Sequence, residues 1–196
     1  MYTPINLAPL WWRQQASRKT WDQEMAELFC EFQPISTPTP GINLYSERQP
    51  RLYRIWDISQ KFLLLMNNIL IAGPQTSSSP EQLMAVLPNN ALDPVRQPIF
   101  MGLGDETLTL ASVKAADGRP ALKLMERSIM DLYRNTEESL SFTFYSRTDG
   151  NQETCCFESA AFPGWFISTS NELNKPVGLS LEGGSRITIF YFERKR

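Results

Sequence analysis

Short alternating segments separated by turn dipeptides constrain the fold of this chain most strongly. Three such dipeptides each lie between two of these segments: Asn67-Asn68, Asp117-Gly118 and Asp149-Gly150. Asn and Gly adopt positive φ at little cost, so these dipeptides predict β-hairpins. Residues 51–196 hold about twelve short strands of this kind, with one helical turn near Ile129. The pattern predicts an all-β barrel or sandwich and does not choose between the two.

The first 45 residues differ in composition from the rest. Apolar residues recur there at helical spacing, and Thr20 stands in front of them as a candidate cap. The residues with this spacing are Trp21, Met25, Leu28 and Phe29. Residues 33–41 then have the Pro-rich composition of a linker. The first 45 residues have two interpretations: they form either a flexible tail with one nascent helix or a packed segment. We expect the first, with residues 1–45 as a flexible or partly helical extension and residues 46–196 as the folded domain.

The sequence of 196 residues contains no histidine, which excludes several chemistries. Neither Ser-His-Asp nor Cys-His catalysis can be assembled, and no imidazole can bind a metal ion. The net charge of −2 does not indicate nucleic-acid binding. The longest apolar runs are too short to cross a bilayer. We therefore expect no cofactor, no metal site, no nucleic-acid partner and no insertion into a membrane.

The chain has an odd number of cysteines, and two of the three are adjacent in sequence. They are Cys30, Cys155 and Cys156. Neighbours on a strand point to opposite faces, so a disulfide between Cys155 and Cys156 is disfavoured and we expect three free thiols. These two are also the best candidates for an enzymatic nucleophile. No histidine can act as their base, and Glu153 and Glu158 would raise the pKa of a neighbouring thiol. We expect that the protein is not an enzyme.

Residues 157–169, with the sequence FESAAFPGWFIST, resemble the signature of the interleukin-1 cytokine family. That signature has an aromatic residue, then a serine, a proline, an apolar pair and a small residue followed by Thr, with a later apolar position that is Val177 here. The residues that carry the resemblance include Phe157, Ser159, Pro163, Gly164, Trp165 and Phe166. Further segments, among them RIWD at residues 54–57, resemble the receptor-antagonist subgroup of the same family. The resemblance covers residue 51 to the C-terminus and leaves residues 1–45 unmatched.

The resemblance implies a β-trefoil, in which six strands form a barrel and six more form hairpins that cap it. In such a barrel the large side chains of the signature fill the interior, and Pro163-Gly164 turns the chain between strands. The signature is therefore mainly a packing motif. A trefoil lectin is the alternative binding module, but no polar-aromatic motif occurs three times in the sequence.

The resemblance also implies an extracellular, monomeric ligand that binds the ectodomain of an interleukin-1-type receptor, such as the interleukin-1 or interleukin-36 receptor. Trp56, Gln60 and Tyr191 match receptor-contact positions of the family's antagonists. Trp and Tyr bury a large area at low entropic cost, so they suit an interface anchor. A core position is the alternative for Trp56, because either face of its strand could point inward.

The loop at residues 88–98 has the length found in the receptor-antagonist subgroup. A short loop removes surface that could meet an accessory chain, so we expect a ligand that occupies the primary receptor without recruiting that chain. The alternative is an interleukin-36-like agonist that signals after cleavage. Counting back from the triplet at residues 55–57 places the candidate processing site at Ser46, and residues 1–45 would then be a removable or non-binding extension. The N-terminal residues do not resemble a signal peptide, so we expect a cytoplasmic precursor that is secreted without one.

Overall fold

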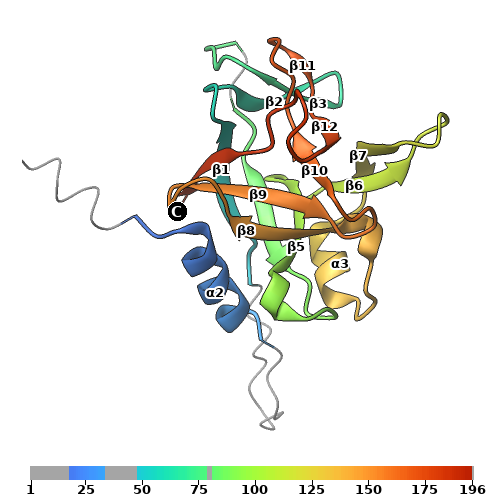
Figure 1. Cartoon of the computed structure of the whole chain (residues 1–196). Helices are drawn as coiled ribbons and strands as arrows, with labels where there is room; N and C mark the ends of the chain where they lie inside the picture. Colours follow the sequence, from blue (N-terminus) through green and yellow to red (C-terminus); the bar gives the residue numbers. More distant parts are fainter. Residues whose placement is uncertain (1–17, 34–47, 79–80, 196) are drawn as a thin grey trace, which may run out of the picture.

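The computed structural model describes residues 18–33, 48–78 and 81–195 (Figure 1). Strands dominate these residues, as the sequence predicts. The strands are β1 (Arg51–Asp57), β2 (Phe62–Met66), β3 (Ile69–Gly73), β4 (Met84–Pro88), β5 (Pro98–Leu103), β6 (Leu108–Lys114), β7 (Pro120–Glu126), β8 (Thr143–Thr148), β9 (Thr154–Ser159), β10 (Trp165–Ser168), β11 (Lys175–Pro176), β12 (Gly178–Leu181) and β13 (Phe190–Lys195). The helical elements are α2 (Trp21–Glu31), α3 (Ile129–Arg134) and the single turns η1 (Pro94–Arg96) and η2 (Leu140–Phe142).

Six antiparallel strands form a closed ring. β1 pairs with β13, β13 with β9, β9 with β8, β8 with β5, β5 with β4, and β4 returns to β1. Three hairpins, β2–β3, β6–β7 and β10–β12, extend from this ring. The structure thus has the six barrel strands and six hairpin strands of the expected trefoil, and the two-residue β11 is one strand more than the predicted twelve. The barrel, and not a sandwich, is the all-β arrangement of this chain.

The predicted turn dipeptides make the hairpins. Asn67 and Asn68 both have positive φ, at 50° and 61°, and connect β2 to β3. Gly118 has φ 83° between β6 and β7, and Gly150 has φ 79° between β8 and β9. The turns therefore use residues that tolerate the left-handed region, as hairpin geometry requires.

Helix α2 confirms the prediction of a partly helical extension. The Thr20 hydroxyl accepts a hydrogen bond from the Gln23 amide at 3.2 Å, and the Gln23 side chain accepts one from the Thr20 amide at 2.9 Å. This reciprocal cap satisfies donors that the first turn would otherwise leave free. The helix lies against the barrel near the C-terminus (Figure 1), and its apolar face is buried in the core. For residues 18–33 the structure therefore supports the packed interpretation in place of the flexible tail that we expected.

Large side chains fill the barrel. The fully buried aromatic residues are Trp21, Phe32, Tyr53, Phe100, Phe144, Phe157 and Phe190. β1 alternates between buried and half-buried positions, with Tyr53 and Ile55 facing the interior. This alternation places Trp56 on the outer face of the barrel, and the candidate site is built on that face.

Candidate functional site

Three aromatic side chains lie side by side on the outer face of β1, β2 and β13. Trp56 is directly opposite Tyr191 on β13 and Phe62 on β2. Its ring stacks on that of Tyr191 at 5.8 Å between centroids and on that of Phe62 at 5.7 Å. We call Trp56, Phe62 and Tyr191 the aromatic stripe. All three side chains are half-buried, so the stripe offers a wide amphipathic surface to a partner.

Arg54 fixes one edge of the aromatic stripe. Its guanidinium carbon lies 4.7 Å from the ring centroid of Phe62 and 5.8 Å from that of Trp56. The same guanidinium group forms an ion pair with Glu81 and donates to the Gln75 side chain at 2.7 Å. Cation–π contacts and a paired charge together hold these long side chains in one arrangement, which lowers the entropy that a partner would have to remove on binding.

Gln60 lies in the turn between β1 and β2, next to the stripe. It is exposed and has φ 66°, a conformation that non-glycine residues seldom adopt. Asp57, which is fully buried, holds this turn: one carboxylate oxygen accepts from the amides of Ser59 at 2.9 Å and Lys61 at 3.0 Å. The other oxygen meets the Lys61 ammonium at 2.9 Å and the Thr169 hydroxyl at 2.6 Å. The turn is therefore anchored from inside the barrel while Gln60 faces solvent.

The predicted receptor-contact residues thus come together at one place. Trp56 and Tyr191 are in ring contact, and Gln60 lies in the tight turn that brings Phe62 opposite Trp56. Sequence reasoning did not assign a role to Phe62, Arg54 or the buried Asp57. The short spacing between Trp56 and Phe62 could have revealed the role of Phe62, because a tight turn makes these two residues cross-strand neighbours.

The family-signature residues lie mainly inside the barrel. Phe157 is 1% exposed and Phe166 is 3% exposed, while Trp165 is half-buried and packs against the core. The Ser159 hydroxyl is buried and accepts a hydrogen bond from the Phe162 amide at 3.2 Å.

The connection from β9 to β10 runs through Pro163 and Gly164. Pro163 is exposed, and Gly164 has φ 83°. The Gly164 amide donates to the Glu158 carboxylate at 2.9 Å.

The cysteines are free thiols. Cys30 is exposed on α2, whereas Cys155 and Cys156 are buried on β9. Burial raises the pKa of both β9 thiols, so neither is a thiolate at neutral pH. Within the described ranges, no group of acidic and cysteine side chains could hold a metal ion. The helices of this part of the chain are all too short or too polar to cross a membrane. The candidate processing site at Ser46 lies outside the described residues.

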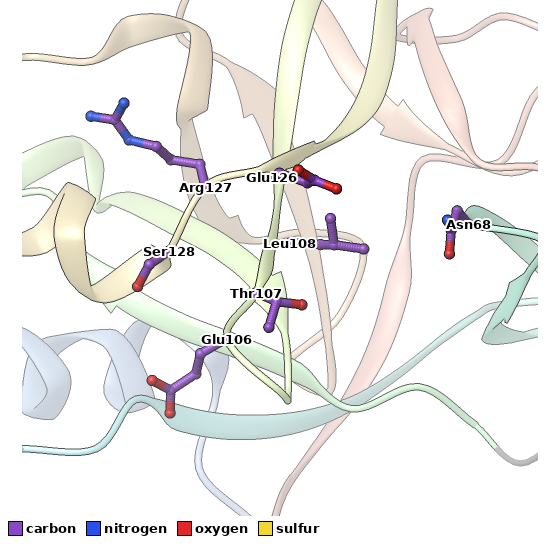
Figure 2. A pocket seen from close by; sticks show the side chains of 7 residues that line it. All are labelled: Asn68, Glu106, Thr107, Leu108, Glu126, Arg127 and Ser128. Atoms are coloured by element: carbon purple, nitrogen blue, oxygen red, sulfur yellow. The ribbon is translucent and has the colours of Figure 1, made fainter.

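A shallow hollow of about 530 Å³ lies between the β6–β7 hairpin and the β2–β3 turn (Figure 2). Leu108 is its only apolar lining residue, and Arg127 extends away from Asn68 on the opposite side. The other lining residues are Glu106, Thr107, Glu126 and Ser128. Small-molecule sites are mostly apolar with a few convergent polar groups, and this hollow lacks that character.

Comparison with known proteins connects this fold to one family. The family model described as Interleukin-1 / 18 matches residues 81–192. Interleukin-1 family member 10 of Mus musculus is 40% identical over 149 residues, covering 74% of this chain and 95% of the relative. The interleukin-36 receptor antagonist protein of Mus musculus is 39% identical, covering 72% and 93%. The interleukin-1 receptor antagonist protein of Canis lupus familiaris is 37% identical, covering 73% and 79%.

Solved structures agree with the sequence comparison. Chicken interleukin 1 beta aligns with a TM-score of 0.62 at 28% identity, covering 74% of this chain and 97% of the other. The pro-inflammatory cytokine interleukin-36alpha aligns with a TM-score of 0.60 at 32% identity, covering 74% and 94%. These relatives are cytokines and receptor antagonists, and the prediction that this protein is not an enzyme is confirmed. The closed barrel with three hairpins, the matched family model and the relatives together show that the chain belongs to the interleukin-1 family of cytokines.

Proposed function

We propose that this protein is an extracellular, monomeric antagonist of an interleukin-1-type receptor. It occupies the primary receptor without recruiting the accessory chain, and the aromatic stripe with Gln60 forms its contact surface. The function requires no chemistry and no cofactor, because a bound ligand that fails to recruit the second chain blocks signalling by occupancy alone.

The aromatic stripe is the observation that carries this proposal. Trp and Tyr are enriched among residues whose truncation costs most binding energy, and they tend to cluster in one patch. Trp56 and Tyr191 are in contact and Gln60 adjoins them, so three residues expected from sequence to meet the receptor share one surface. The stripe is held by Arg54 and the buried Asp57, so binding would not need to order it first.

Two observations favour antagonism. Relatives that cover more than 70% of this chain are named receptor antagonists of the interleukin-1 and interleukin-36 systems. The loop at residues 88–98 is short, and the Arg96 guanidinium carbon lies 3.7 Å from the ring centroid of Tyr145. A short loop offers less surface to an accessory chain than a longer loop would.

An agonist is the second candidate function. The structural likeness to interleukin-36alpha, described as pro-inflammatory, favours it at 32% identity. In that case cleavage near Ser46 would precede signalling, and N-terminal sequencing of the active species would find Ser46 or a close neighbour. An active species that begins at Met1 would contradict processing.

The test mixes the full chain with the interleukin-1 and interleukin-36 receptor ectodomains, with and without their accessory chain, and measures the mass of each complex. A one-to-one complex that does not take up the accessory chain is the expected result. A ternary complex would make the protein an agonist. No complex with either receptor would overturn the proposed function.

Matched variants locate the surface. Trp56→Ala should weaken receptor binding by about 30-fold or more, the loss expected for a central anchor. Leu181→Ala removes an apolar side chain that is 55% exposed on β12, outside the stripe, and should leave binding unchanged. Equal losses from both variants would mean that the stripe is not the contact surface.

A further inference from the structure

We propose that the end of the barrel beneath α2 is a specific helix-binding groove whose occupant is α2 of the same chain. Helix α2 would then be an internal ligand of the barrel, held by apolar anchors, by a buried carboxylate and by polar contacts at both of its ends. A helix of the same sequence supplied from outside could take its place. This inference does not depend on the proposed receptor.

The apolar anchors of α2 are completely enclosed. Trp21, Met25 and Leu28 have no exposed surface, and neither has Phe32 immediately after the helix. At the barrel end, Trp21 packs against aromatic rings from three separate strands. Its ring centroid lies 5.1 Å from that of Tyr53 on β1, 5.3 Å from that of Phe157 on β9 and 5.0 Å from that of Phe192 on β13. A helix resting loosely on a surface would not bury four large side chains in this way.

A buried carboxylate gives the groove polar specificity. Glu24 is 7% exposed, and its carboxylate accepts from the Tyr53 hydroxyl at 2.7 Å and from Arg51 at 3.3 Å. Arg51 is itself 7% exposed, and its second acidic partner is Glu31, at 2.6 Å. Both carboxylates that neutralise Arg51 therefore come from α2. Without the helix, a barrel arginine and a barrel tyrosine would lose their partners.

Groups from β8, from α3 and from the loop between β4 and β5 also meet the two ends of the helix. At the start, the Asp22 carboxylate accepts from the Thr148 amide at 2.9 Å and from the Gln97 side chain at 3.1 Å. At the end, the Phe32 carbonyl accepts from the Asn90 side chain at 2.9 Å and from the Tyr133 hydroxyl at 3.1 Å. Contacts at both ends fix the position of the helix along its axis as well as its rotation.

The groove and the aromatic stripe lie on opposite faces of the same strands. Tyr53 on β1 and Phe192 on β13 pack against Trp21, whereas Trp56 and Tyr191 point the other way because neighbouring strand positions alternate. A docked α2 therefore leaves the stripe uncovered, and loss of one surface need not affect the other.

The test is an exchange experiment on the full chain. A fluorescein-labelled peptide of residues 18–33 is titrated into wild-type protein and into the Trp21→Ala variant. Replacing a core Trp by Ala weakens packing by about 150-fold or more. A tethered helix competes at an effective concentration of about 1 mM, so the peptide should half-occupy the Trp21→Ala groove at about 7 µM. Wild-type protein should take up no detectable peptide at about 20 µM. This concentration is on the order of 50-fold below the one at which the peptide would half-occupy the wild-type groove.

Two glutamates on the same helix provide a matched control. Glu24→Ala removes the buried carboxylate and should allow measurable exchange even if Trp21→Ala does not fold. Glu27→Ala removes a carboxylate that pairs with Lys19 on the exposed side of the helix and should behave as wild type. In the wild-type chain the backbone amides of α2 should exchange with solvent as slowly as those of β1.

Several results would overturn the inference. These are rapid amide exchange in α2 of the wild-type chain, a folded Trp21→Ala or Glu24→Ala variant that takes up no peptide, and equal uptake by the Glu24→Ala and Glu27→Ala variants. A wild-type protein of twice the 22.4 kDa chain mass that the peptide converts to monomer would assign the groove to the helix of a second copy instead. None of these measurements uses the receptor, so they can fail while the aromatic stripe still binds the receptor; only the dimer result would also contradict the proposed monomer.

Discussion

Replacing Asp57 by Asn should strongly destabilise the folded chain. Asp57 is fully buried and Lys61 is 3% exposed, with 2.9 Å between the ammonium and the carboxylate. Among the described residues, Asp57 is the one acidic residue that pairs with the Lys61 ammonium group. Asp57→Asn therefore leaves a buried cation without a counter-charge. The new amide also presents a donor where Thr169 already donates. Breaking a buried pair from one side costs about 3–5 kcal/mol.

Lys61→Met should cost less, about 1–3 kcal/mol. Asp57 would keep three donors, the amides of Ser59 and Lys61 and the hydroxyl of Thr169. The double variant should recover part of the Asp57→Asn loss, because it removes the stranded ammonium.

The assay is guanidinium unfolding followed by tryptophan fluorescence, with the free energy of unfolding taken by linear extrapolation. Lys19→Met serves as the control, since Lys19 and its partner Glu27 have side chains 46% and 44% exposed. An exposed pair of this kind contributes little to stability, so this variant should unfold like the wild type. Equal losses for Asp57→Asn and Lys61→Met, or a double variant less stable than Asp57→Asn alone, would refute the reasoning.

Three further predictions concern single residues. Gln60→Gly should keep or slightly raise the free energy of unfolding, because glycine adopts the positive φ of Gln60 without strain, yet it should weaken receptor binding in a titration. Iodoacetamide at pH 7 should alkylate Cys30 in the native protein and spare Cys155 and Cys156, as peptide mass analysis would show; labelling of all three at equal rates would contradict their burial. Burial and then the hydrogen bond to Glu24 raise the pKa of Tyr53, so its phenol proton is held more tightly in the folded state. Stability should accordingly be full below about pH 10 and fall as the pH rises above it, with a smaller alkaline loss in Tyr53→Phe.

Local signals were sufficient for the hairpins. Asn67 and Asn68 form a two-residue turn with positive φ at both positions, and Gly118 and Gly150 supply positive φ in the longer connections after β6 and β8. Residues that tolerate this conformation therefore identify the hairpins without knowledge of the rest of the fold. The closure of the ring was beyond this kind of reasoning. The pairing of β1 with β13 joins segments more than a hundred residues apart, and the family resemblance supplied what periodicity could not.

The candidate site was predictable in its members and not in its geometry. Alternation along β1 left two faces open for Trp56, and only the burial of Tyr53 and Ile55 in the folded chain shows that Trp56 points outward. The role of α2 escaped prediction for a related reason. Helical spacing identifies its apolar face, but the surface that this face meets includes Phe157 and Phe192, which lie more than a hundred residues further along the chain.

The distant partners of α2 set an order for biosynthesis. The Asp22 amide bonds to Thr148, 126 residues later in the chain. At about 5–20 residues per second, the ribosome makes Thr148 roughly 6–25 s after it has made the helix. During that interval Trp21 has no complete barrel end to enter, because β13, which carries Phe192, is translated later still. Helix α2 is therefore made before the strands that enclose it and settles after them, so enclosure of Trp21 should mark a late step of folding.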